Sequence, residues 1–212
     1  MHNNFVYLDE VIPGIRWDAK YATWDNFTGA PVDGYEVNRV VGTREMAHAL
    51  KKVNEKAKAK GYGLLLWDGY RPQCAVDCFM RWAQSDKPDY TKEKHFPHID
   101  KKNMFQLGYI AEKSGHSRGS TIDLTLFDLK NNQILDMGGC FDFMDEISHF
   151  DNEHITLSAF RNRSLLRDFM ESCGFIPYEY EWWHFTLKNE PYPDTYFTFP
   201  ITNEPAKIPV AI

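Results

Sequence analysis

The sequence contains few cysteines, no long apolar run and no excess of basic residues, and each shortage excludes a class of protein. Four cysteines among 212 residues are too few for a disulfide scaffold, and a chain of this length buries enough surface to fold without disulfides. No apolar run approaches the roughly 18 residues of a transmembrane helix, so no membrane partner is expected. Cys74 and Cys78 lie one helical turn apart, but no second pair follows at zinc-finger spacing, and we interpret them as ordinary residues.

The charge balance is mildly acidic. The 24 basic residues stand against 30 acidic ones, which gives a formal net charge of −6. This balance lacks the basic patch of a nucleic-acid binder, so no nucleic-acid partner is expected. The first ten residues, MHNNFVYLDE, show neither the basic nor the apolar region of a secretory signal. We therefore expect a cytoplasmic protein with reduced cysteines, and homo-oligomer formation stays open.

Apolar residues at helical spacing predict three main helices. The first runs from Thr43, as N-cap, to Gly61; the second opens at Pro72; the third extends from about Thr156 to Cys173. The polar stretch 85–113 carries two prolines and predicts at most one helix, around Met104–Glu112.

Composition also indicates strands. Tyr62–Trp67 is a short apolar run that ends at an Asp-Gly turn, and Thr121–Leu126 alternates polar with apolar residues. A turn at Lys130–Gln133 and a last strand through FIPYEYEWWHF complete the pattern. The pattern predicts an α+β fold in which helices flank a small antiparallel sheet. We expect a single domain over residues 1–212, with an extended, proline-containing tail from about residue 190.

The segment SGHSRGSTID, residues 114–123, holds the strongest local cluster of chemistry-bearing residues. Seven residues of straight strand would aim His116 and Asp123 in opposite directions, but Gly119 permits a turn that brings them together. An imidazole and a carboxylate are good zinc ligands; two are too few, and His184 is the natural third. Zinc held in this way keeps an open position for a water, whose pKa falls towards about 7.

The segment EYEWWHF, residues 179–185, places Glu181 three residues before His184. On an ideal strand these two side chains point to opposite faces, so the strand must end, bend or bulge between them if both serve one site. Glu181 beside the metal can then take a proton from the water and pass it to a leaving amine. We expect Trp182 and Trp183 to wall the site and hold the bend, and Glu179 to be an ordinary solvated carboxylate.

Each of these residues also has an ordinary interpretation. A histidine flanked by aromatic side chains, as His184 is, is more often a hydrogen-bonded core residue than a metal ligand, and Asp123 on a polar strand face can simply be solvated. The other six histidines have no partner pattern, and we interpret them as surface residues: His2, His48, His95, His98, His149 and His154. Spacing alone is therefore compatible with a zinc hydrolase without establishing one.

Longer motifs carry a family resemblance. SGHSRGSTID is similar to the Ser-x-His-x-x-Gly-x-Ala-x-Asp motif of the zinc D-alanyl-D-alanine peptidases, relatives of the lysostaphin-type and Hedgehog-like folds, and EWWH matches their Glu-x-Trp-His motif. The stretches LDEVIPGIRWDAKYATWDNFTGAPVDGYEVNR, GYGLLLWDGYRP, FDFMDE and EWWHF resemble the vancomycin-resistance type of D-Ala-D-Ala dipeptidase over nearly the whole chain. One motif position departs, because Thr121 stands where the pattern has alanine.

The resemblance implies a role for each matching residue. His116, Asp123 and His184 would bind one zinc ion per chain, and Glu181 would be the catalytic acid and base. Arg71, in DGYRP, would stabilise the oxyanion, because a fixed guanidinium aimed at developing charge favours the transition state.

The same resemblance implies a substrate site. Asp142 would bind the ammonium group of the dipeptide, Ser114 its carboxylate, and Tyr21 would assist. The alternative for Arg71 is a purely structural ion pair with Asp68.

The implied activity is zinc-dependent hydrolysis of free D-Ala-D-Ala to two D-Ala, with a role in glycopeptide (vancomycin) resistance. Three alternatives stay open: a dipeptidase of wall recycling or nutrient use, a D,D-carboxypeptidase, and a catalytically silent zinc-stabilised binding module. Retention of both Glu181 and Arg71 argues against the silent module.

Overall fold

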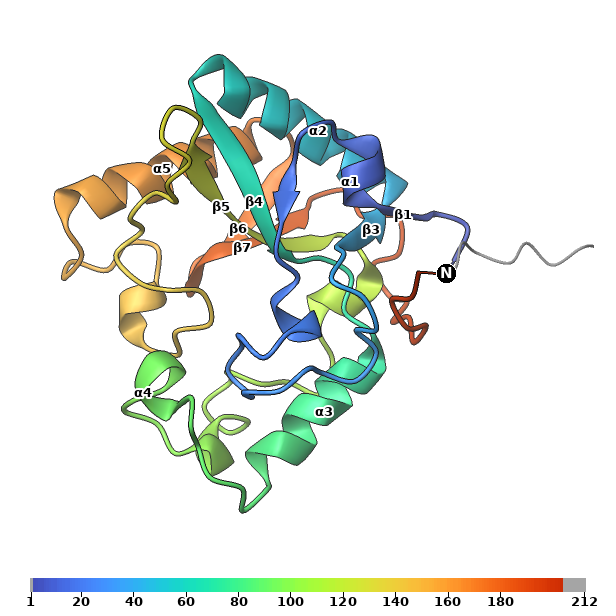
Figure 1. Cartoon of the computed structure of the whole chain (residues 1–212), viewed down its shortest axis with the longest axis vertical. Coiled ribbons are helices and arrows are strands. Elements are labelled where there is room, and N and C mark those ends of the chain that lie inside the picture. The colour runs from blue at the N-terminus through green and yellow to red at the C-terminus, as the bar shows by residue number, and fades with distance from the viewer. Residues whose placement is uncertain (1, 204–212) are drawn as a thin grey trace, which may run out of the picture.

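A computed structural model describes residues 2–203 of the chain (Figure 1). The helices and strands follow in this order: β1 (Phe5–Tyr7), α1 (Leu8–Val11), β2 (Arg16–Trp17), β3 (Val41–Thr43), α2 (Arg44–Ala59), β4 (Tyr62–Asp68), α3 (Gln73–Ala83), α4 (Lys92–His95), β5 (Thr121–Asp128), α5 (Leu157–Glu171), β6 (Phe175–Tyr178) and β7 (Glu181–Leu187). Four short 3₁₀ helices lie between them: η1 (Lys20–Ala22), η2 (Lys101–Asn103), η3 (Gly115–Arg118) and η4 (Glu146–Ser148).

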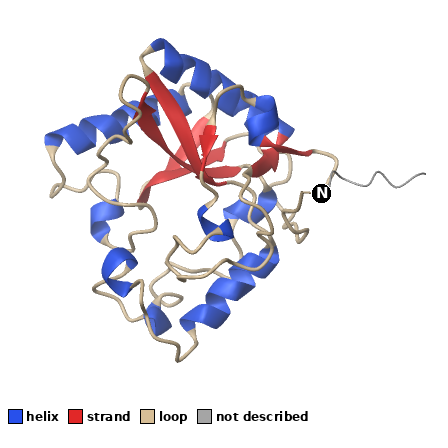
Figure 2. Cartoon of the chain, viewed as in Figure 1, coloured by secondary structure: helices blue, strands red, loops and turns tan. Residues whose placement is uncertain are grey.

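The main sheet has five strands in the order β2-β4-β5-β7-β6. All neighbours are antiparallel except the short β2, which runs parallel to β4. Helices α2 and α5 contact each other and the sheet, and Figure 2 shows the strands lying between these helices and the α3 and α4 region. The predicted α+β fold with a small antiparallel sheet and flanking helices is confirmed, and the parallel β2–β4 pair is an addition to it.

Side-chain caps set the ends of the long helices. Thr43 Oγ1 accepts a hydrogen bond from Met46 N at 3.3 Å and begins α2, and Thr156 Oγ1 does the same for Ala159 N at 3.1 Å at the start of α5. Gly61 follows α2 in a left-handed conformation, with φ +86. The predicted helix boundaries are confirmed to within a few residues. None of the helices in residues 2–203 is long and apolar enough to cross a membrane.

The region 101–113 differs from the prediction. No helix forms over Met104–Glu112; after η2 the chain makes turns, in which Tyr109 N and Ile110 N both bond to Met104 O. Gly108 adopts φ +83, which ends any regular helix at that point. The expected helix is therefore wrong.

Between β7 and residue 203 the tail has no regular helix or strand, as expected, but it packs against the molecule. Ile201 bridges to Tyr35, and the carbonyl of Phe199 accepts a hydrogen bond from the hydroxyl of Tyr70 at 2.8 Å. The part of the predicted tail from residue 204 lies outside the described residues.

Two bulges interrupt the main sheet. Between β4 and β5 the register shifts so that Asp68 pairs with Asp123. Between β6 and β7 the pairing jumps from Tyr178–Glu181 to Pro177–Phe185, so the three residues 182–184 bulge out of this ladder. The departure from strand geometry that was expected between Glu181 and His184 is present, and both bulges place carboxylates at one end of the sheet.

Gly119 ends η3 and has no room for a side chain. Its φ is +86, its carbonyl accepts a hydrogen bond from Thr43 N at 2.9 Å, and a Cβ would overlap the ring of Phe5. The turn that separates His116 from β5 therefore depends on glycine.

We expect Gly119→Ala to destabilise the protein more than Gly61→Ala, because Gly61 has a similar φ but nothing within 4 Å of its would-be Cβ. The strained backbone costs about 1–2 kcal/mol at either position, and the overlap with Phe5 adds about 1–3 kcal/mol at Gly119. Urea unfolding of the two variants measures the difference. Equal midpoints would mean that the Phe5 ring moves aside freely.

Candidate active site

Two imidazoles and one carboxylate face one another where η3, β5 and β7 meet. His116 Nε2 lies 3.3 Å from His184 Nδ1 and 3.3 Å from Asp123 Oδ2, and His184 Nδ1 lies 3.1 Å from Asp123 Oδ1. Their ligand atoms all lie within 4.8 Å of one another, so the three residues form a group that could hold a metal ion. The strand register brings two of these residues together, because Asp123 in β5 is paired directly with His184 in β7.

The chemistry of this donor set fits a tetrahedral cation. Ligands at about 2.0–2.1 Å from zinc stand roughly 3.3 Å apart in a tetrahedron, close to the separations found here. His116 Nδ1 lies 2.7 Å from the carbonyl oxygen of Gly69, which can accept a hydrogen bond from Nδ1–H; in that tautomer the lone pair of Nε2 faces the other two ligands. Asp123 Oδ1 is buried and accepts no hydrogen bond from the described residues, as a carboxylate oxygen reserved for a metal would.

Opposing effects set the pKa values of this group. Burial disfavours the charged form of Asp123, but the imidazoles of His116 and His184 outweigh it and hold the pKa of Asp123 well below its usual range. Burial also favours neutral His184, yet the neighbouring carboxylate of Asp123 raises the pKa of His184. The carboxylate of Asp123 therefore stays ionised inside the protein.

Glu181 begins β7 and approaches the same group. Its Oε2 lies 3.3 Å from His184 Nδ1, and its side chain keeps 32% of its surface exposed, against 3% for Asp123. Burial and the neighbouring charge of Asp123 raise the pKa of Glu181, although His184 opposes the shift. A carboxylate with a raised pKa at the open side of the group can accept and release a proton.

The guanidinium of Arg71 is fixed by the buried carboxylate of Asp68. Its Nε donates to Asp68 Oδ2 at 2.9 Å, and Asp68 Oδ1 accepts a hydrogen bond from the Tyr35 hydroxyl at 2.6 Å. Asp68 Oδ2 also lies 3.4 Å from His116 Nδ1, while Arg71 Nη2 lies 3.7 Å from Asp123 Oδ2. Arg71 thus has the ion pair that was its structural alternative, and it faces the candidate metal group as well.

Asp142 lies in a strained turn and has no cationic side chain bonded to it within residues 2–203. Its φ is +55, and its Oδ2 accepts a hydrogen bond from the hydroxyl of Tyr21 at 2.8 Å. Burial, followed by repulsion from Asp123, raises the pKa of Asp142 well above its usual range. Tyr21 is 2% exposed, and Arg71 Cζ lies 4.9 Å from the centre of its ring.

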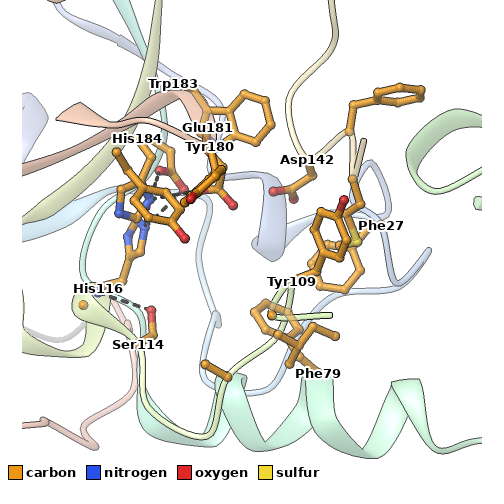
Figure 3. A pocket seen from close by; sticks show the side chains of 18 of the residues that line it. Phe27, Phe79, Tyr109, Ser114, His116, Asp142, Tyr180, Glu181, Trp183 and His184 are labelled. Carbon is orange, nitrogen blue, oxygen red and sulfur yellow. Dashed lines mark hydrogen bonds and ion pairs between the residues drawn. The ribbon is translucent and has the colours of Figure 1, made fainter. Parts of the chain in front are cut away.

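All eight residues predicted to serve the site line one cavity of about 540 Å³. Figure 3 shows His116, His184 and Glu181 together on one side, with Asp142 facing them and the rings of Phe27, Phe79 and Tyr109 beyond it. Ser114 lies below His116, whose backbone N donates to Ser114 Oγ at 3.3 Å.

A family model described as D-ala-D-ala dipeptidase, of the M15 peptidases, matches residues 1–202. The chain belongs to this family. The predicted family is therefore confirmed.

Relatives of the M15 dipeptidase family match almost end to end. D-alanyl-D-alanine dipeptidases from Enterococcus faecalis and Streptomyces coelicolor are 56% identical over 202 and 201 residues, covering 95% of this chain and 100% of each relative. That from Escherichia coli is 36% identical over 182 residues, 86% of this chain and 83% of the relative. A solved LdcB LD-carboxypeptidase superimposes with a TM-score of 0.47 at 20% identity, covering 89% of this chain and 70% of that one.

Two expectations for this M15 chain need correction. His95 is not a surface residue: it is 3% exposed, its Nδ1 lies 3.2 Å from the carbonyl of Asp142, and burial lowers its pKa to about 4. Trp183 lines the cavity, but Trp182 does not; it packs on Trp67 at 5.9 Å between ring centres. The segment 182–184 therefore has only one of its tryptophans in the wall of the site.

Thr121, which stands where the family motif has alanine, lies next to the candidate metal ligands and not among them. Its Oγ1 is 3.0 Å from Thr186 Oγ1, and the two residues are register partners next to the Asp123–His184 pair. The additional hydroxyl links β5 to β7 and displaces none of the predicted ligands.

The hydrogen-bonded pair of Asp68 and Tyr35 supports the site and was not predicted from the sequence. The available signal was a carboxylate placed at the end of the apolar strand β4, a position where a charge needs a partner. No local pattern connects Tyr35 to it, because the two residues are 33 positions apart.

We expect Tyr35→Phe to lower the free energy of unfolding by about 1.5–3 kcal/mol, because it removes a hydrogen bond to a buried carboxylate. Tyr70→Phe is the matched control: its buried ring also stays, and its hydroxyl bonds to a neutral carbonyl, so a loss of about 0.5–1.5 kcal/mol is expected. Urea unfolding measures both. A smaller loss for Tyr35→Phe would show that Asp68 does not depend on the tyrosine hydroxyl.

Proposed function

We propose that this M15 family member is a zinc dipeptidase that hydrolyses free D-Ala-D-Ala to two D-Ala. One observation carries the proposal: a candidate metal group, a carboxylate with raised pKa, a guanidinium and a second carboxylate, which has no ion-pair partner within residues 2–203, converge on one cavity. The choice of D-Ala-D-Ala as substrate is supported by the relatives that are named D-alanyl-D-alanine dipeptidases.

His116 Nε2, His184 Nδ1 and a carboxylate oxygen of Asp123 would hold the zinc ion, one per chain. When bound, zinc supplies a Lewis acid that polarises the peptide carbonyl and acidifies a water. Asp68 and the carbonyl of Gly69 fix the ring of His116, which keeps its Nε2 aimed at the ion.

Glu181 handles the proton of the reaction. Its Oε2 takes a proton from the attacking water and delivers it to the nitrogen of the departing D-Ala, so that a neutral amine leaves. The raised pKa of Glu181, which follows from burial and from Asp123, makes it a better proton acceptor than a solvated carboxylate.

Arg71 stabilises the negative charge that develops on the carbonyl oxygen. Because Nε is fixed on Asp68, the terminal nitrogens of the guanidinium keep one orientation and need not reorganise during the reaction. This pairing makes Asp68 a support for the catalytic role of Arg71 as well as its structural partner.

Asp142 binds the ammonium group of the dipeptide, which supplies the cation that this carboxylate lacks within residues 2–203. Ser114, at the other end of the cavity, binds the substrate carboxylate. Tyr21 acts through Asp142, since its hydroxyl already donates there. A pocket that satisfies both termini favours a dipeptide over a longer chain.

Three further expectations stay predictions: cytoplasmic location, homo-oligomer formation, and depletion of D-Ala-D-Ala as a route to glycopeptide resistance.

Two substitutions test metal binding and proton transfer separately. We expect His184→Ala to lose bound zinc, because two ligands are too few, and Glu181→Ala to keep zinc while kcat falls about 10²–10⁴-fold. Metal analysis of the purified proteins, together with kinetics on D-Ala-D-Ala, measures both. Full zinc in His184→Ala would refute the ligand set, and zinc loss in Glu181→Ala would make Glu181 a ligand.

The substrate is tested by ninhydrin assay of D-Ala-D-Ala, D-Ala-D-Lac and a stem pentapeptide, each with and without a chelator. We expect turnover of D-Ala-D-Ala alone, abolished by the chelator and restored by Zn²⁺. Turnover of the pentapeptide would identify a carboxypeptidase, and no turnover of any substrate would identify a binding module.

A further inference from the structure

Arg163 is a fully buried arginine in α5, outside the residues assigned to the reaction. It is 0% exposed, and three of its nitrogens donate to backbone carbonyls: Nε to Met137 at 2.6 Å, Nη1 to His149 at 2.6 Å and Nη2 to Ile147 at 2.8 Å. Each nitrogen of the guanidinium therefore donates to a backbone carbonyl of the segment 137–149.

The charge of Arg163 is not used in an ion pair within residues 2–203. Arg167, one turn later in α5, pairs with Glu171 and Glu179, whereas the hydrogen-bond acceptors of Arg163 in the described part of the chain are backbone carbonyls. Burial lowers the pKa of Arg163 to about 10, which still leaves it charged at neutral pH. Burying a cation costs free energy, and an apolar residue of similar volume would fill the same space without that cost. We therefore interpret Arg163 as a residue that fixes the positions of the backbone carbonyls it binds.

The three acceptor carbonyls share a location. They belong to the segment 137–149, with Met137 before Asp142 and Ile147 and His149 after it. One guanidinium thereby fixes both ends of the segment relative to each other, and Asp142 lies between them with its left-handed backbone. On the other side, Met144 N donates to the carbonyl of His95 at 2.7 Å.

Arg163 also contacts the strand that carries Glu181. Its Cζ lies 5.8 Å from the centre of the Trp182 ring, and Trp182 directly follows Glu181 in β7. A single side chain thus lies against the residue next to the proposed base and against the segment that holds the proposed ammonium site.

We propose that Arg163 is a positioning residue of the dipeptidase, which fixes the segment 137–149 so that Asp142 faces the candidate metal group at the distance a dipeptide requires. This inference rests on the proposed function, because the ammonium of the substrate is what Asp142 would bind. Loss of Arg163 would then weaken substrate binding first, and it would leave the ligands on η3, β5 and β7 in place.

The test compares Arg163→Met and Arg163→Lys with Arg161→Met, an exposed arginine of the same helix. We expect KM for D-Ala-D-Ala to rise at least about tenfold in Arg163→Met and by less in Arg163→Lys, which keeps the charge but offers one nitrogen. We expect kcat to change less than KM, bound zinc to stay at the wild-type ratio, and Arg161→Met to behave as wild type. An unchanged KM in folded Arg163→Met would overturn the proposal.

A double-mutant cycle separates positioning from general loss of stability. If Arg163 acts through Asp142, Arg163→Met should add little to the KM of Asp142→Asn. Fully additive effects on KM would contradict the proposal. Loss of folding in both Arg163 variants would also overturn it, since Arg163 would then serve the stability of the whole chain.

Amide hydrogen exchange gives a readout that does not depend on activity. We expect faster exchange in Arg163→Lys within the segment 137–149 and unchanged exchange in α2 and β4. Faster exchange across the whole chain would contradict a local role. Should the wild-type protein fail to hydrolyse D-Ala-D-Ala, the proposed function fails, while the exchange experiment still decides whether Arg163 orders this segment.

Discussion

Repulsion between carboxylates that line one cavity is the constraint around which this molecule is arranged. Asp68, Asp123, Asp142 and Glu181 share their surroundings with one buried guanidinium, that of Arg71. Four carboxylates and one guanidinium leave three formal negative charges, which a divalent cation and a substrate ammonium would balance. The raised pKa values of Asp142 and Glu181 reflect the same imbalance, since burial and neighbouring carboxylates both favour the protonated form.

The backbone distributes these charges by leaving regular geometry at a few points. The β4 bulge sets Asp68 opposite Asp123, the left-handed Gly119 separates His116 from β5, and the β7 bulge separates Glu181 from His184. Regular strands on either side of each irregularity give the site its rigidity, because their ladders and the buried leucines of β4 and β5 fix the flanking residues. Arg163 extends the same principle to a segment without regular structure, where backbone carbonyls bonded to a side chain replace a ladder.

Local sequence pattern predicted those parts of the fold whose cause is local. Helix α2 could be placed because Thr43, the apolar spacing and Gly61 all act within one segment, and the two halves of the site could be placed because their motifs are continuous. Interactions across long sequence separations could not be found this way. The Tyr35–Asp68 bond, the burial of His95 beneath Asp142 and the parallel pairing of β2 with β4 have no periodic signature. The expected helix at Met104–Glu112 failed for the opposite reason, because turn bonds and the left-handed Gly108 overrode a weak local pattern.

The bulge in β7 constrains the chain in its length as well as its composition. Trp182 and Trp183 span the gap between Glu181 and His184, and the ladder with β6 resumes at Phe185. Removing or adding one residue there would shift every later side chain of β7 to the opposite face of the sheet, carrying His184 away from Asp123. We therefore expect the bulge to tolerate substitutions but no change of length. Insertions or deletions in this hairpin are expected only in the two-residue turn formed by Glu179 and Tyr180.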